Sequence, residues 1–253
     1  ETFYGCGALE TLILPESVTY LGSMMIRGTA VNSITIPKSV SDCGVNNSGS
    51  NYYLGPLAGA SYLTAVTIED GMEKIPDYLC SSQSLSSYIT SVNIPSSVTS
   101  IGNRAFCGCD KLVNAEMPDT VTSIGENVYS QSTKLKSIKL SSTLKTIGGG
   151  AFSGCTDLQK VVIPSTVTNL GSNAFNGCTS LTDAEFNYNT QKGYTLEIGG
   201  GAFYGCSALE NVMLSENVSR IGSETFYGCG ALETLILPES AVSYTHLRAH
   251  ETV

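Results

Sequence analysis

The stretch AFSGCTDLQKVVIPSTVTNLGSNAFNGCTSLTDAEF, residues 151–186, contains the same kind of segment twice. Two strand-like parts, Leu158–Ile163 and Leu181–Phe186, follow the pattern L-x-x-h-x-h, in which h is an apolar residue. Each follows the motif A-F-x-G-C, at residues 151–155 and 174–178, so the pattern returns after 23 residues. A repeat of this length cannot bury its apolar side alone, which predicts coils stacked into a solenoid.

The same cadence runs along the rest of the chain. A proline usually follows the strand-like segment, and V-T-x-I-G comes next, as at residues 98–102 and 121–125. The step from Phe175 to Phe203 is 28 residues, which places a five-residue insertion near 189–195. Ten strand-like segments are expected, at residues 9–14, 31–36, 63–68, 89–94, 112–117, 135–140, 158–163, 181–186, 209–214 and 232–237.

Each recurring residue type has an expected physical role. In L-x-x-h-x-h the first, fourth and sixth residues point inward and build a continuous core with the neighbouring coils. Proline ends the strand because it has no N–H for the next ladder bond. The phenylalanine of A-F stacks into an aromatic spine. The glycines of I-G and of G-C are both expected to supply a positive φ at tight corners.

The consensus P-x-x-V-T-x-I-G-x-x-A-F-x-G-C-x-x-L-x-x-V-x-I-P resembles the BspA-type leucine-rich repeat of bacterial and protist surface proteins. The resemblance covers residues 1 to about 240 and departs from the pattern in a Gly/Asn/Ser/Tyr segment at residues 43–62. We therefore expect a β-rich solenoid, a curved array of about ten coils with one parallel sheet and little helix. The resemblance also implies an extracellular or cell-surface chain, and several relatives are described as adhesins for host proteins.

The two ends of the chain carry an identical sequence. Residues 1–17 and 224–240 both read ETFYGCGALETLILPES, after which the repeat pattern stops. We interpret residues 1–240 as a solenoid fragment truncated at both ends, and residues 241–253 as an artefactual non-repeat tail; a natural C-terminal cap is the alternative. Uncapped coils expose core and strand edges, so end-to-end self-association is expected.

Composition argues against several classes of function. The net charge of −9 disfavours a nucleic-acid partner, which needs clustered Lys and Arg. No apolar run approaches the roughly 18 residues that span a bilayer. Both histidines, His246 and His250, lie in the tail, so the repeats lack Ser-His or Cys-His pairs and His-containing zinc sites. We expect no cofactor, no metal and no enzyme activity. The enzymatic alternative, a paired-carboxylate site for carbohydrate cleavage, would use Asp183 and Glu185.

The nine cysteines allow three interpretations. Six of them, Cys6, Cys109, Cys155, Cys178, Cys206 and Cys229, share one column of the repeat, and Cys43, Cys80 and Cys107 fall outside it. The first is disulfide bonding, because stacked pairs lie within the Cα range of a disulfide, and the second is a thiolate metal site. A ladder of buried, reduced cysteines that act as small apolar residues is the favoured interpretation, because residues in one column point the same way.

Two surfaces are candidates for ligand binding. The first is a mixed-charge stripe on the strand-lined side, for which coil-to-coil salt bridges are the alternative explanation; it comprises Glu116, Lys136, Lys139, Lys160, Asp183 and Glu185. The second consists of Tyr52, Tyr53 and Tyr62, for which an ordinary convex loop is the alternative. The favoured function is a non-catalytic module that binds a protein or glycan of a host surface or matrix. A structural spacer that presents another domain is the alternative.

Overall fold

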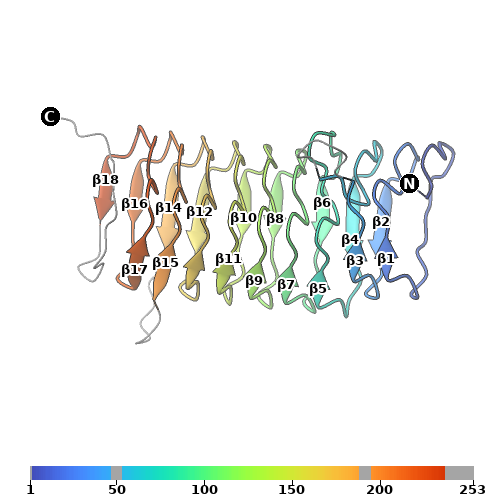
Figure 1. The fold of residues 1–253 in the computed structure, drawn as a ribbon, viewed down its shortest axis with the longest axis horizontal. Helices are drawn as coiled ribbons and strands as arrows, with labels where there is room; N and C mark the ends of the chain where they lie inside the picture. Colours follow the sequence, from blue (N-terminus) through green and yellow to red (C-terminus); the bar gives the residue numbers. More distant parts are fainter. Residues whose placement is uncertain (1, 47–52, 188–194, 237–253) are drawn as a thin grey trace.

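The computed structural model describes residues 2–46, 53–187 and 195–236, which form one elongated solenoid of stacked coils (Figure 1). The L-x-x-h-x-h segments form a first row of parallel strands, and we call their outward surface the strand face. Its members are β2 (Ser33–Ile36), β4 (Ala65–Ile68), β6 (Ser91–Asn93), β8 (Asn114–Glu116), β10 (Ser137–Lys139), β12 (Lys160–Ile163), β14 (Asp183–Phe186), β16 (Asn211–Met213) and β18 (Thr234–Ile236).

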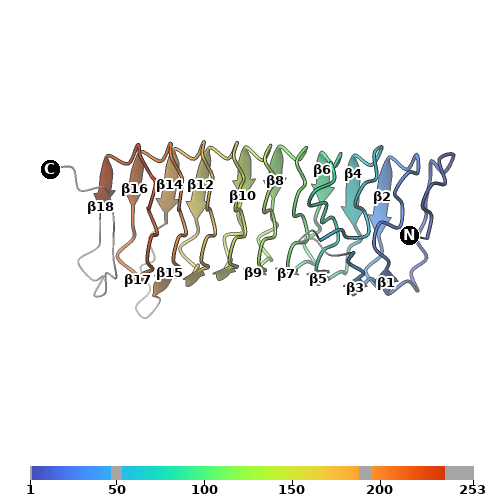
Figure 2. The same ribbon diagram turned by 45° about the horizontal axis from the view of Figure 1, so that its top comes forward.

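The V-T-x-I-G segments form a second row of short strands on another side of the coil (Figure 2). They are β1 (Tyr20–Leu21), β3 (Asp42–Cys43), β5 (Lys74–Ile75), β7 (Ser100–Ile101), β9 (Ser123–Ile124), β11 (Thr146–Ile147), β13 (Asn169–Leu170), β15 (Leu196–Ile198) and β17 (Val218–Ile221). The structure therefore differs from the expected single sheet. The first row divides into sheets of three and six strands, and the second row divides into sheets of two and seven strands. The expected curvature is slight in both views, because strands stack at the same spacing on both rows.

A third side of each coil is formed by the A-F-x-G-C turn and the residues just before it, and we call it the turn face. Its backbone is not strand, yet it also forms hydrogen bonds from coil to coil. The N–H of Phe152 donates to the carbonyl of Ala174 at 2.7 Å, and that of Gly154 donates to Asn176 at 2.8 Å. Three sides of the solenoid thus carry backbone ladders.

The core lies inside the coils, between the three sides, and follows the expected pattern. Leu158, Val161 and Ile163 are at most 1% exposed, which confirms the inward positions of the strand motif. The aromatic residues stack as expected. Their ring centroids are 5.2 Å apart for Phe106–Tyr129, 5.6 Å for Tyr129–Phe152, 5.0 Å for Phe152–Phe175, 5.3 Å for Phe175–Phe203 and 5.7 Å for Phe203–Phe226.

The first strand-like segment, residues 9–14, is not a strand, although its identical copy contains β18. The first coil still donates to the second on the turn face, from Phe3 to Met25 and from Gly5 to Arg27. The second coil is one residue shorter from Gly28 to Val31 than a regular coil is from Gly177 to Leu181. Residues 9–14 do not pair with β2 beyond this shortened turn, and nine of the ten expected strands form.

Glycine occurs at its two motif positions for different physical reasons. The glycine of G-C has the expected positive φ, for example 74° at Gly154 and 71° at Gly177. The expectation was wrong for the glycine of I-G, which does not have a positive φ. There, a Cβ on Gly171 would lie 2.5 Å from the Gly149 nitrogen, so close approach between coils excludes a side chain.

Removing one ring from the aromatic spine should strongly destabilise the fold. Phe175 is fully buried between two stacked rings, and Phe175→Ala is expected to lower the free energy of unfolding by about 3–5 kcal/mol. Phe3 occupies the same column but is only partly buried, so Phe3→Ala should cost clearly less. Urea denaturation followed by circular dichroism compares the two variants; equal losses would contradict the stacked-spine description.

The close approach at I-G gives a matched pair of glycine variants. Gly171→Ala should cost about 1–3 kcal/mol of unfolding free energy, because the new methyl group meets the backbone of the preceding coil. Gly22 occupies the same motif position, but no atom lies within 4 Å of its added Cβ. Gly22→Ala should therefore leave the unfolding midpoint unchanged or raise it slightly. Thermal melts of both variants test this difference.

Candidate functional site

The expected mixed-charge stripe lies on the strand face across β8, β10, β12 and β14. Lys139 is the register partner of Glu116, and its ammonium forms an ion pair with that carboxylate. This hydrogen bond raises the pKa of Lys139. Lys160 pairs with Glu185 of the next coil at 3.5 Å. All four side chains are more than half exposed, so each pair contributes little to stability and is screened by salt.

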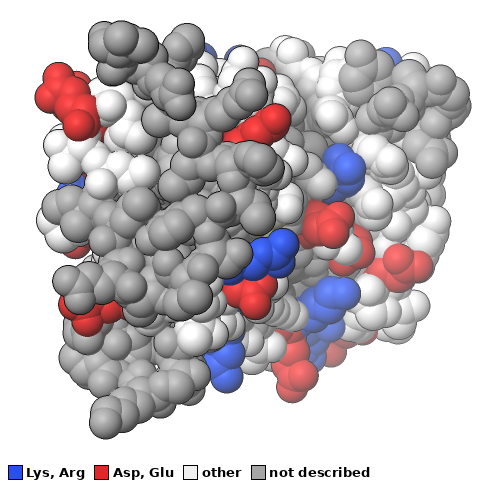
Figure 3. Space-filling view, turned by 60° about the vertical axis from the view of Figure 1, so that its left-hand side comes forward, with Lys and Arg blue, Asp and Glu red and all other residues white. Residues whose placement is uncertain are grey.

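The other two residues of the stripe have no such partner among the described residues of the neighbouring coils. Lys136 precedes β10, is exposed, and forms no ion pair within the described part of the chain. Asp183 is the register partner of Lys160, but it accepts a hydrogen bond from the adjacent Thr182 hydroxyl at 2.8 Å instead. On the part of the described surface that is visible in Figure 3, acidic and basic side chains lie next to each other.

The expected tyrosine patch is only partly present as an accessible surface. Tyr52 lies outside the described residues. Tyr53 is half-buried, its ring stacks on Tyr78 with centroids 5.6 Å apart, and the Arg104 guanidinium lies 4.2 Å from its centre. Tyr62 is 65% exposed and has no ring contact among the described residues. Tyr53 thus fastens the segment at residues 53–62 to the turn face, and of the two described tyrosines only Tyr62 presents an open ring.

The cysteine column forms a hydrogen-bonded ladder in the core. All nine cysteines are free thiols and seven are buried. The thiol of Cys155 donates to the carbonyl of Tyr129 at 3.1 Å, and that of Cys178 to Phe152 at 3.2 Å. Ser132 occupies the same column and its hydroxyl makes the equivalent bond to Phe106 at 3.1 Å. Burial raises the pKa values of these thiols, so they remain protonated; no group of three potential metal ligands occurs within residues 2–46, 53–187 and 195–236.

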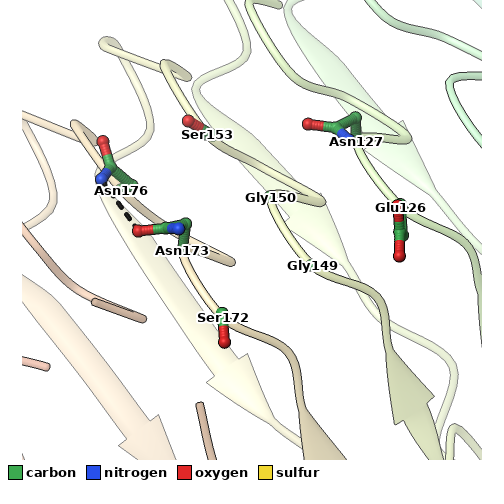
Figure 4. A pocket seen from close by; sticks show the side chains of 8 residues that line it. All are labelled: Glu126, Asn127, Gly149, Gly150, Ser153, Ser172, Asn173 and Asn176. Carbon is green, nitrogen blue, oxygen red and sulfur yellow. Dashed lines mark hydrogen bonds between the residues drawn. The ribbon is translucent and has the colours of Figure 1, made fainter. Parts of the chain in front are cut away.

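The turn face contains a hollow that the sequence analysis did not identify. It has a volume of about 460 Å³ and an open, polar surface (Figure 4). Eight residues from three adjacent coils line it: Glu126, Asn127, Gly149, Gly150, Ser153, Ser172, Asn173 and Asn176. Alignment of the two residues after each I-G motif would have revealed the signal, because Gly149-Gly150 replaces a pair of polar side chains there.

The comparison with protein families matches six copies of the BspA type leucine rich repeat region, over residues 1–90, 73–195 and 189–249. The chain belongs to this family. A comparison with the curated proteins finds no match. Among the described residues, no helix is long and apolar enough to cross a membrane.

Solved structures of bacterial leucine-rich-repeat proteins have the same fold. A protein from Bacteroides ovatus is 26% identical, with a TM-score of 0.64 over 93% of this chain and 62% of its own. A leucine rich cell surface protein from Faecalibacterium prausnitzii is 22% identical, with a TM-score of 0.51 over 88% of this chain and 72% of its own. The pneumococcal vaccine antigen PcpA is 22% identical, with a TM-score of 0.54 over 83% of this chain and 61% of its own. The chain thus spans less than two thirds of the Bacteroides protein and of PcpA.

The buried thiols should make the protein less stable in alkali. Burial raises the pKa of Cys109 from its ordinary 9.0 to about 12, so the folded state keeps a proton that the unfolded state loses. The free energy of unfolding should therefore be unaffected below pH 9 and fall as the pH rises from 9 towards 12, by on the order of 1–2 kcal/mol for each buried thiol at pH 10.5. Urea midpoints at pH 8 and pH 10.5 measure this loss.

A serine variant isolates the contribution of the thiols. Serine does not titrate in this range and makes the same hydrogen bond at Ser132, so a variant with Cys155→Ser, Cys178→Ser and Cys206→Ser should fold. Its midpoint should fall less than that of the parent protein between the two pH values. An equal fall would show that other groups cause the alkaline sensitivity.

Proposed function

We propose that this chain is a non-catalytic binding module of a cell-surface protein, with a protein or glycan ligand held on the strand face. The supporting observation is that the recurring polar side chains of the second row of strands serve the fold. The threonine of V-T-x-I-G illustrates this: Thr122 donates its hydroxyl to the carbonyl of Thr99 at 3.2 Å in the preceding coil. The outward positions of the strand face carry varied, exposed side chains instead.

The stripe offers both charge signs to a ligand at low cost. The two ion pairs, Lys139–Glu116 and Lys160–Glu185, are exposed enough that a ligand can replace either partner without leaving a buried charge. Lys136 and Asp183 add one charge of each sign at the same strands. The isolated apolar side chains Val162 and Met213, 37% and 65% exposed, lie beside Glu185 in register. This combination suits a polar macromolecular surface.

A cell-surface location is part of the proposal and draws on the similarity to the Faecalibacterium cell surface protein and to the pneumococcal antigen. The second candidate function is a structural spacer. It draws on the same two ion pairs, because charges that join neighbouring coils also stiffen a solenoid. A binding experiment distinguishes the two functions.

Reversing the charge of the stripe should strongly weaken ligand capture. We expect the parent protein to retain at least one protein in a pull-down against mucosal extracellular-matrix proteins. A variant with Lys136→Glu, Lys139→Glu and Lys160→Glu should reduce that binding at least tenfold, because both ion pairs become like-charge contacts. Titration of the purified matrix protein by biolayer interferometry at two salt concentrations measures the change.

A second triple variant controls for net charge and for lost ion pairs. Lys74 and Lys111 each form one exposed ion pair away from the strand face, and Lys145 has none among the described residues. Changing these three to Glu alters the net charge by the same amount, from −9 to −15, since each change contributes −2. The control should bind like the parent protein. Equal losses in both variants would refute the stripe, and absence of any capture would favour the spacer.

A further inference from the structure

Two adjacent positions of the turn face alternate between polar side chains and glycine from one coil to the next. Residues 126–127 are Glu-Asn, 149–150 Gly-Gly, 172–173 Ser-Asn, 200–201 Gly-Gly and 223–224 Ser-Glu. Backbone hydrogen bonds keep these pairs on neighbouring coils, from Asn127 to Gly149 at 2.9 Å, from Gly150 to Ser172 at 2.9 Å and from Asn173 to Gly200 at 3.0 Å. Each glycine pair therefore forms a floor between two polar walls.

The floor at Gly149-Gly150 coincides with the hollow in Figure 4. Its glycines cannot fill the space: Gly150 has a φ of 62°, and a Cβ there would lie 2.6 Å from the Asn127 amide oxygen. The open space is thus fixed by the backbone and by the neighbouring side chain. It is present without any movement of the coils, which favours binding because no ordering cost arises.

Several polar groups that line the hollow have no hydrogen-bond partner in the described part of the chain. They are the side-chain amide of Asn127 and the hydroxyls of Ser153 and Ser172. The Asn176 amide nitrogen donates to the Asn173 amide oxygen at 3.2 Å. The Asn173 amide nitrogen and the Asn176 amide oxygen therefore stay available to a ligand. One coil earlier, by contrast, Asn103 is fully engaged: it donates to Asp77 at 3.1 Å and accepts from the Glu126 N–H at 2.8 Å.

This set of groups selects the chemistry of a ligand. Amides and hydroxyls both donate and accept hydrogen bonds, as sugar hydroxyls do. The lining contains one carboxylate, Glu126, and no Lys or Arg, which disfavours an anion such as phosphate. It contains no large apolar side chain for a hydrophobic anchor, and too few acidic groups to hold a metal ion. A neutral polyhydroxyl compound fits the hollow best.

Aromatic rings continue the same surface towards the C-terminal coils. The column that contains Ser153 and Asn176 proceeds to Tyr204 and Tyr227, with backbone hydrogen bonds from Gly177 to Tyr204 at 2.8 Å and from Gly205 to Tyr227 at 2.7 Å. The two tyrosine rings stack with centroids 5.0 Å apart, and Tyr227 is 47% exposed. Tyrosine offers a rigid, amphipathic contact area suited to the C–H face of a sugar ring.

From these observations we propose that the turn face between Glu126 and Tyr227 is a binding site for a neutral oligosaccharide. Its hydroxyls hydrogen-bond in the hollow around Gly149-Gly150, and its further rings lie against Tyr204 and Tyr227. The site extends over four coil intervals, about 19 Å at ~4.8 Å each, which is the length of several sugar units. The inference goes beyond the strand-face function and does not rest on it.

Affinity gel electrophoresis against soluble starch, xylan, glucomannan and mixed-linkage β-glucan tests this site. At least one of these neutral polysaccharides should retard the parent protein, and calorimetry with the matching hexasaccharide gives a Kd. The double variant Asn127→Gly, Asn173→Gly should raise that Kd at least tenfold. It should fold normally, because both residues have a positive φ, 55° and 58°, and glycine occupies the same column at residues 150 and 201.

Three further variants assign the result. Ser84→Gly relieves a positive φ of 73° outside the face between Glu126 and Tyr227, and should leave the Kd unchanged. Tyr204→Ser with Tyr227→Ser should weaken hexasaccharide binding at least tenfold but leave disaccharide binding intact. The strand-face triple lysine variant should bind the sugar normally. Retardation by none of the four polysaccharides, an unchanged Kd in the Asn double variant, or sugar binding lost with the lysines would each overturn the proposal.

Discussion

Backbone hydrogen bonds between successive coils are the interaction on which the rest of this structure depends. They run along three sides of the solenoid, through two rows of parallel strands and the turn face. Because each coil must present its N–H and C=O groups at the spacing of its neighbour, side chains of one column are forced into contact. The aromatic stack from Phe106 to Phe226 and the thiol ladder at Cys155 and Cys178 are consequences of this register.

The same constraint explains which residues recur and which vary. Glycine recurs at the motif position of Gly171 because the ladder brings the backbone of the preceding coil too close for a side chain. Threonine recurs at the motif position of Thr122 because its hydroxyl donates a hydrogen bond to a carbonyl of the preceding coil. The fold does not require contacts of this kind from the outward side chains of the strand face and of the turn face. The residue types at the positions of Lys136 and Asn127 can therefore differ from coil to coil without loss of the fold. Binding chemistry is therefore expected where the columns are least uniform.

The sequence predicts most of the core and little of the surface. Inward positions such as Val161 follow from period-two alternation repeated every 23 residues, and burial enforces both. The glycine of I-G was misjudged because a positive φ and a close backbone approach select the same residue. Residues 9–14 were misjudged because their sequence equals that of 232–237, whereas strand formation depends on the register of the neighbouring coil. Tyr53 was predicted as a candidate binding residue, but its ring is held by Tyr78 and Arg104, which lie on later coils.

The hollow shows how a solenoid can acquire a site without altering its core. At residues 149–150 two glycines replace a polar pair, and the ladder holds the flanking Glu126-Asn127 and Ser172-Asn173 walls in place. No core residue has to change, since Phe152 and Cys155 keep their stacked and hydrogen-bonded positions in the same coil. A site made in this way depends on differences between adjacent coils, so it disappears when the repeats are reduced to a consensus. The consensus encodes the scaffold, and the departures from it determine what the scaffold can bind.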